Sequence, residues 1–298
     1  MKGIADLRPG ILVLTVLALV VAPLDILAQK VGPANGSLVI VGGSMRDTNI
    51  VARFIELAGG PDAPIVVIPT AGEREDYADS NSGLRTFRNR GATNLTVLHT
   101  RDRGVANSAE FVQALRGAAG VWFGGGRQWR LADAYLGTQT EEELWQVLER
   151  GGVVGGSSAG ATIQGSYLVR GDTRTNTIMM GDHEEGFGFL TQSAIDQHLL
   201  RRNRQFDLVE VIEARPELLG IGIDENTAIV VQRDTFEVMG QGYVAIYDSQ
   251  RMVGDAGKFY FLAPGNRYAL DTREPLRQSR DGFQPIEGIR SAPWPNRQ

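Results

Sequence analysis

The stretch "GGVVGGSSAGATIQG", from Gly151 to Gly165, places a short apolar strand directly before a run of small residues. Two β-branched valines lead into a glycine pair, two serines and the small residues of a helix start. Such a segment could cradle a phosphate, allow tight packing, or expose one serine at a strand–helix turn. Small residues suit all three, so the rest of the chain has to distinguish them.

Composition excludes several classes of site. The 298-residue chain has a formal net charge of −5, so we expect no general attraction to nucleic acid. It contains no cysteine, which excludes disulfides, thiolate metal ligands and a cysteine nucleophile. Only His99, His183 and His198 could supply imidazole, and we expect neither a metal site nor a cofactor.

The first 28 residues differ from the rest of the chain. Lys2 and Arg8 precede an apolar run from Ile11 to Ala22, which Pro23 then interrupts. The run is short for a span of ~20 residues, so we expect no stable membrane span. It is typical of a secretory signal peptide cleaved near Ala28, with an uncleaved anchor or a buried helix as alternatives. The prediction is a secreted or periplasmic protein.

Residues 29–298 are predicted to form one α/β domain. Apolar runs alternate with stretches of helical periodicity; the runs are residues 37–43, 63–70, 94–100, 120–126 and 152–156, and the helical stretches are 49–60, 82–91, 108–118 and 140–151. This alternation predicts a doubly wound, mainly parallel sheet. Residues 218–232, 235–248 and 258–271 are predicted to be strands that extend it, and residues 272–298 a surface strand or coil. Ligands of such sheets bind beyond the carboxyl ends of the strands, where the glycine-rich turns fall.

Ser158 is the candidate nucleophile. Gly156 to Gly160 match G-x-S-x-G at the end of a strand and the start of a helix, the context of a nucleophile elbow. The amide of Ala159 then lies at a helix N-terminus, where it can bind an oxyanion. The stretch has no G-x-G-x-x-G fingerprint and no lysine after the glycines, so nucleotide phosphate is disfavoured.

A serine nucleophile needs a base, and His198 is the best candidate. It lies in "AIDQHLLRRNRQFDL", close to Arg202 and Arg204, which are suited to holding a substrate carboxylate. His198 could also be a residue at a helix start, with the arginines on a solvated face. For His99 and His183 a surface or structural role is the better interpretation.

Four motifs together carry a family resemblance. They are "FGGGRQ" (123–128), "GSSAGA" (156–161), "IDQHLLRRNR" (195–204) and "GIGIDENTA" (220–228). In this order they resemble the cyanophycinase branch of the serine peptidase family that also contains aspartyl dipeptidase. The resemblance implies a fold similar to class I glutamine amidotransferases and flavodoxin. It also implies cleavage of peptide bonds next to aspartyl residues, as in cyanophycin, a poly-aspartate that carries arginine on each side chain.

The resemblance also implies roles for individual residues. Ser158 would be the nucleophile and His198 the base, with an oxyanion hole from Ala159 and the Gly125–Gly126 turn. Asp172 is the acid expected to orient His198, ahead of Asp182, Glu184 and Glu185. The residues expected to bind substrate are Gln128, Asp196, Gln197, Arg202, Arg204 and Glu225, the last as a contact for a guanidinium. The family also suggests a homodimer.

Two residues depart from the family pattern. Asp207 stands where a third arginine is common, and Arg127 where Asp or Asn is expected. Reversed charge should alter specificity more than chemistry. The departures also motivate an alternative, a non-catalytic homologue that binds peptides or carboxylated ligands. A serine esterase is a third possibility, although in α/β-hydrolases the histidine follows the final strand, unlike His198.

Overall fold

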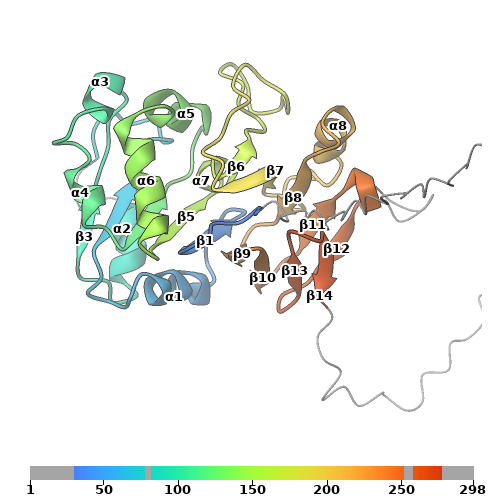
Figure 1. Ribbon diagram of the computed structural model, residues 1–298, viewed down its shortest axis with the longest axis horizontal. Coiled ribbons are helices and arrows are strands. Elements are labelled where there is room, and N and C mark those ends of the chain that lie inside the picture. Colours follow the sequence, from blue (N-terminus) through green and yellow to red (C-terminus); the bar gives the residue numbers. More distant parts are fainter. Residues whose placement is uncertain (1–29, 78–81, 252–257, 277–298) are drawn as a thin grey trace, which may run out of the picture.

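The computed structural model describes residues 30–77, 82–251 and 258–276, which form two sheets with helices around them (Figure 1). The predicted signal peptide and most of the C-terminal tail lie outside the described residues. Within those residues, no helix is both long and apolar enough to cross a membrane. Assignment of residues 29–298 to a single domain stays a prediction.

The first sheet has nine strands and a parallel half built from the N-terminal part of the chain. Its order is β14-β13-β10-β9-β1-β5-β4-β2-β3. The parallel strands are β1 (Ser37–Val41), β2 (Ile65–Ile68), β3 (Leu95–Val97), β4 (Gly120–Phe123) and β5 (Val153–Ser157). Four of them, all except β3, are buried or nearly so along their length, which explains their continuous apolar sequences. This half confirms the prediction of an α/β fold.

Helices cover both faces of the parallel half. On one face lie α1 (Thr48–Leu57) and α2 (Ser82–Arg88), whose apolar side chains pack with Trp122. The other face packs against α6 (Gln139–Glu149), α5 (Trp129–Tyr135), α4 (Gln113–Arg116) and α3 (Arg103–Ala106). The helix predicted over residues 108–118 is therefore much shorter, with turns before it. The helix α7 (Ala159–Thr162) follows β5 directly.

The C-terminal strands divide between the two sheets, which corrects the prediction that all of them extend one sheet. The strands β9 (Thr227–Gln232), β10 (Thr235–Gly240), β13 (Arg267–Ala269) and β14 (Glu274–Leu276) extend the first sheet by antiparallel pairing. The second sheet has the order β12-β11-β8-β7-β6. Its strands are β6 (Gly165–Tyr167), β7 (Leu190–Gln197), β8 (Leu219–Ile223), β11 (Val244–Tyr247) and β12 (Tyr260–Leu262).

The second sheet brings a new set of strand ends to the site. Its strands β6, β7 and β8 are parallel to one another, and α8 (Asp207–Ala214) connects β7 to β8. Figure 1 shows β7 and β8 beside β5 and β1, so the second sheet lies next to the middle of the first. Sequence reasoning missed β6 and β7, because their residues mix polar and apolar side chains with no clean alternation.

Phe54 packs α1 against the sheet, and its burial allows a prediction about stability. Its ring is fully buried and meets the rings of Phe87 and Trp122 at centroid distances of 5.5 and 5.1 Å. We expect Phe54→Ala to lower the free energy of unfolding by about 3–5 kcal/mol, measured by urea denaturation. Val105→Ala, at a valine that is 44% exposed, should change it by less than about 0.5 kcal/mol. Equal effects of the two substitutions would contradict this account of the core.

Candidate active site

Ser158 lies in a strained turn between β5 and α7. Its φ is 59° and its ψ is −113°, a conformation that a residue with a Cβ rarely adopts. The flanking glycines are needed sterically: a Cβ on Gly156 would overlap the carbonyl of Gly160, and one on Gly160 would overlap that of Phe123. Of the three uses considered for this stretch, the geometry fits the presentation of one serine.

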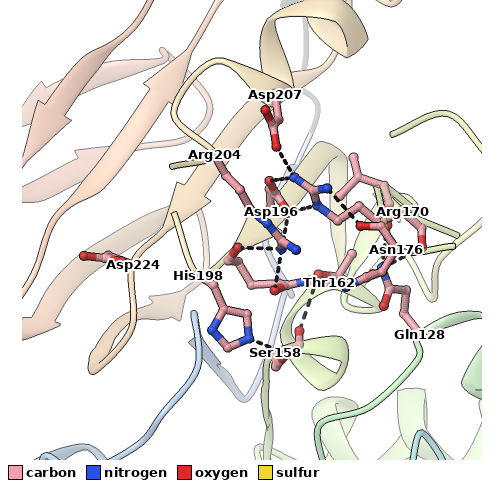
Figure 2. Close-up of polar contacts among 12 residues, drawn as sticks. Gln128, Ser158, Thr162, Arg170, Asn176, Asp196, His198, Arg204, Asp207 and Asp224 are labelled. Carbon is pink, nitrogen blue, oxygen red and sulfur yellow. Dashed lines mark hydrogen bonds and ion pairs between the residues drawn. The ribbon is translucent and has the colours of Figure 1, made fainter. Parts of the chain in front are cut away.

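His198 contacts the Ser158 hydroxyl. It directly follows β7 rather than starting a helix, and its φ is 56°. The distance from His198 Nε2 to Ser158 Oγ is 2.9 Å (Figure 2). The His198 amide donates to the carbonyl of Gly42 at 2.9 Å, and a Cβ on Gly43 would overlap the imidazole ring. The two glycines after β1 therefore hold the ring in place.

The acid beside His198 is Glu225, which corrects the expectation for Asp172. Glu225 Oε1 lies 2.7 Å from His198 Nδ1. Asp172 instead accepts hydrogen bonds from the amides of Arg174 and Thr175 at 3.0 and 2.8 Å, and so shapes its own loop. Glu225 thus contacts the imidazole, while the guanidinium contact expected of it stays a prediction.

Sequence reasoning missed this role because it looked for the acid between Ser158 and His198. A usable signal was present, since Glu225 comes two residues after β8. The strand β8 pairs in parallel with β7, which ends immediately before His198. The carboxyl ends of parallel neighbours meet at one edge, so a residue just beyond β8 was a candidate.

His198 favours its neutral form. Burial lowers the pKa of His198 below its ordinary value of 6.5, and the nearby charges of Arg202 and Arg204 lower the pKa further, against the opposing effect of Glu225. A neutral imidazole with a carboxylate on Nδ1 presents Nε2 as an acceptor to the serine hydroxyl. The arrangement can therefore take a proton from Ser158 at neutral pH.

Two backbone amides beside Ser158 could bind a substrate oxygen. A Cβ built on Gly125 would be 3.4 Å from the Cβ of Ser158, so this glycine lies against the serine. Within the described residues, neither the amide of Gly125 nor that of Ala159 donates a hydrogen bond. Gly126 has a φ of 147°, and a side chain there would overlap the carbonyl of Ala71. The turn predicted as an oxyanion hole is thus adjacent to the nucleophile.

A buried ion-pair network adjoins His198. The carboxylate of Asp196 is fully buried and receives both Nε and an amino nitrogen of Arg170, at 2.8 and 2.9 Å. Arg204 donates to Gln197 Oε1 at 3.0 Å and lies 3.8 Å from Asp196. Asp196 and Gln197 therefore hold arginines in place rather than facing open space. Figure 2 shows the group above the Ser158–His198 pair.

The residues that depart from the family pattern both have partners. Asp207 accepts from Arg170, and so shares that guanidinium with Asp196. Arg127 donates to the carbonyls of Asp172 and Thr175. The two reversed charges are thus part of the structure around the site.

The remaining sequence candidates have structural contacts. Gln128 is buried, and its Nε2 donates to the carbonyls of Val169 and Arg170 at 2.8 and 2.9 Å. Arg202 is exposed near His198. His99 Nδ1 bonds Thr70, and His183 lies between Asp133 and Asp182, which agrees with structural or surface roles for both histidines.

Comparison with known proteins agrees with the site. The family model described as Peptidase family S51 matches residues 38–239. This chain belongs to peptidase family S51. It is therefore a serine-type peptidase, as its resemblance to cyanophycinases implied.

Curated relatives and solved structures give the same picture. A cyanophycinase from Geminocystis herdmanii is 32% identical and aligns over 81% of this chain and 96% of its own length. One from Synechococcus elongatus is 34% identical over 72% of this chain and 68% of its own length. The crystal structure of a peptidase from an acI-B1 actinobacterium has a TM-score of 0.59 at 24% identity, covering 80% of this chain and 98% of that one. At that identity the solved structure supports the fold alone.

The position of His198 predicts how the reactivity of Ser158 depends on pH. Only the neutral imidazole can accept the serine proton, so reactivity should fall as pH drops through the pKa of His198, with a midpoint below 6.5. Arg202→Met removes a nearby positive charge that lowers this pKa, so the midpoint should move to higher pH. The measurement is the rate of labelling by an uncharged fluorophosphonate against pH. The control is Arg53→Met, because Arg53 lies on α1 and pairs with Glu56. It should leave the pH midpoint of labelling unchanged. A shift of the midpoint with Arg53→Met but not with Arg202→Met would contradict the assignment.

Proposed function

We propose that this S51 peptidase cleaves peptide bonds next to aspartyl or isoaspartyl residues, including those of cyanophycin-like polymers, through an acyl-enzyme. The observation that carries the chemistry is the hydrogen-bonded series Ser158 Oγ–His198 Nε2 and His198 Nδ1–Glu225 Oε1. The substrate class is supported by the curated relatives, which are cyanophycinases.

In the proposed mechanism Ser158 Oγ attacks the scissile carbonyl while His198 Nε2 takes the hydroxyl proton. Glu225 accepts from Nδ1–H, which fixes the tautomer and stabilises the imidazolium as it forms. The imidazolium then protonates the leaving amine, and an ester between Ser158 and the acyl fragment remains. His198 then deprotonates a water molecule that attacks the ester, and the imidazolium returns this proton to Ser158 Oγ as the second product leaves.

The negative charge that develops on the carbonyl oxygen would be bound by backbone amides. The Gly125 and Ala159 amides are the candidates, since both lie beside Ser158 and make no other hydrogen bond in the described part of the chain. We also assign the Ser158 turn as a nucleophile elbow, supported by its positive φ of 59° between a strand and a helix. The class I glutamine amidotransferase-like fold is proposed on the same basis.

Substrate carboxylates would be bound by Arg202 and Arg204. Arg204 is nearly buried, and its Nε and second amino nitrogen make no hydrogen bond within the described residues. Burial and neighbouring arginines lower the pKa of Arg204 to about 10, a cost that an anionic ligand would offset. Export by a cleaved leader, supported by the sequence of residues 1–28, and assembly as a homodimer are further parts of this proposal.

The test is hydrolysis of cyanophycin and of isoaspartyl peptides by the protein and by Ser158→Ala. We expect Ser158→Ala to reduce kcat by about 10⁴-fold or more, because the acyl-enzyme cannot form. Equal activity of the variant would rule out the mechanism. Binding of these peptides by both proteins without hydrolysis would instead support the non-catalytic alternative, and preference for p-nitrophenyl esters the esterase.

The two candidate acids can be separated by conservative substitutions. Glu225→Gln should lower kcat by about 10³- to 10⁴-fold, because the amide cannot stabilise the imidazolium. Asp172→Asn keeps an oxygen to accept from the amides of Arg174 and Thr175, and should change kcat by less than about tenfold. Steady-state kinetics on the same peptides provide the measurement. The reverse ranking would return the role to Asp172.

A further inference from the structure

A pocket next to His198 has walls of opposite charge. It has a volume of about 490 Å³ and is lined by Arg170, Thr177, Met179, Arg202, Arg204, Phe206, Asp207 and Glu210. Its arginine wall adjoins the candidate base, because the Arg202 amide donates to the carbonyl of His198 at 3.0 Å. The charges of Arg202 and Arg204 also act on the His198 imidazole, so the pocket adjoins the segment that carries the candidate base.

Arg170 is not available to a ligand. Its side chain is 2% exposed, and it donates to both oxygens of Asp196, to Asp207 and to the carbonyl of Asn176. Two arginines of the pocket lining can therefore face a ligand. Arg202 is exposed, and Arg204 uses only Nη1 for its hydrogen bonds within the described residues. These two form the cationic wall.

A second part of the pocket lining belongs to the start of α8 and is acidic. Asp207 gives one oxygen to Arg170, and its side chain remains 35% exposed. Glu210 lies one turn further along α8, is exposed, and forms no ion pair within the described residues. Phe206, beside them, is 64% exposed. A carboxylate pair next to an aromatic face is suited to a guanidinium or ammonium group.

The formal charges around this pocket differ from those of a site that binds only anions. Arg170, Arg202 and Arg204 in the lining are matched by Asp207, by Glu210 and by Asp196, which does not line the pocket but pairs with Arg170; the formal charges of these six residues therefore cancel. With an arginine in place of Asp207 it would carry two more positive charges and would favour ligands with net negative charge. A neutral pocket with separated charges instead favours a ligand that carries both signs itself.

We infer that Asp207 and Glu210 are specificity-determining residues that bind the cationic side chain of a substrate unit whose carboxylate is held by Arg202 and Arg204. This rests on the proposed function and deepens it: the preferred substrate unit is dipolar, with a guanidinium or ammonium group and a carboxylate a few bonds apart. The guanidinium lies between the two carboxylates and the ring of Phe206. The role expected of Glu225 from sequence thus passes to these two residues.

The experiment compares two synthetic aspartyl oligomers, one with arginine and one with citrulline on each side-chain carboxyl. Citrulline has nearly the same shape as arginine but no charge, so the ratio of their kcat/KM values isolates recognition of the cation. We expect the protein to prefer the arginine oligomer by about 10- to 100-fold. Glu210→Gln and Asp207→Asn should each bring this ratio closer to one, mainly through KM for the arginine oligomer.

The matched control is Glu213→Gln on the same helix, because Glu213 pairs with Lys258 and does not line the pocket; it should keep the ratio of the unmodified protein. Asp207→Asn retains an oxygen for Arg170, and Glu210 is exposed, so both variants should fold. Equal kcat/KM for the two oligomers, or an unchanged ratio in both variants, would overturn the inference while leaving the proposed function intact. Failure to cleave either oligomer would count against both.

Discussion

The contact between His198 and Ser158 depends on two sheets meeting at one point. Ser158 follows β5 of the first sheet, whereas His198 follows β7 of the second. The junction is formed by Gly42 and Gly43, whose carbonyls accept from the amides of His198 and Asn226 at 2.9 and 2.8 Å. A side chain at either glycine would overlap neighbouring atoms. The nucleophile and its base can therefore approach each other only because the two residues after β1 have no side chain.

The same junction explains why Glu225 reaches His198. The chain leaves the second sheet at the end of β8 and enters the first sheet as β9, with Glu225 in the short crossover between them. A crossover held by backbone bonds on both sides has little freedom, and its carboxylate is aimed at the imidazole before any substrate arrives. Such preorganisation means that the site need not rearrange to stabilise the imidazolium.

The features that could be predicted from the sequence are those whose signal lies in neighbouring residues. Ser158 was identifiable because its turn is determined by adjacent glycines, and His198 because so few histidines are present. The parallel half of the first sheet was predictable from its continuous apolar strands. The partner of His198 was sought only between Ser158 and His198, whereas Glu225 is brought to the imidazole by the parallel pairing of β7 with β8, a non-local contact. The strands β6 and β7 were missed because they mix polar and apolar residues, and the second sheet was not separated from the first because strand pairing is non-local.

The reversed charge at Asp207 is explained by the ion pairs that this residue and its neighbours form. Taken alone, an acid in an arginine-rich segment suggests a lost anion site. In the structure Asp207 is the second carboxylate that pairs with the buried guanidinium of Arg170, beside Asp196. Burying this positive charge would cost more free energy if Asp196 were its only carboxylate partner. A buried ion pair of this kind adds little net stability compared with apolar packing, so its value lies in geometry. It holds the loop after β6 against the start of α8, and it fixes the position of Asp207 in the lining of the pocket.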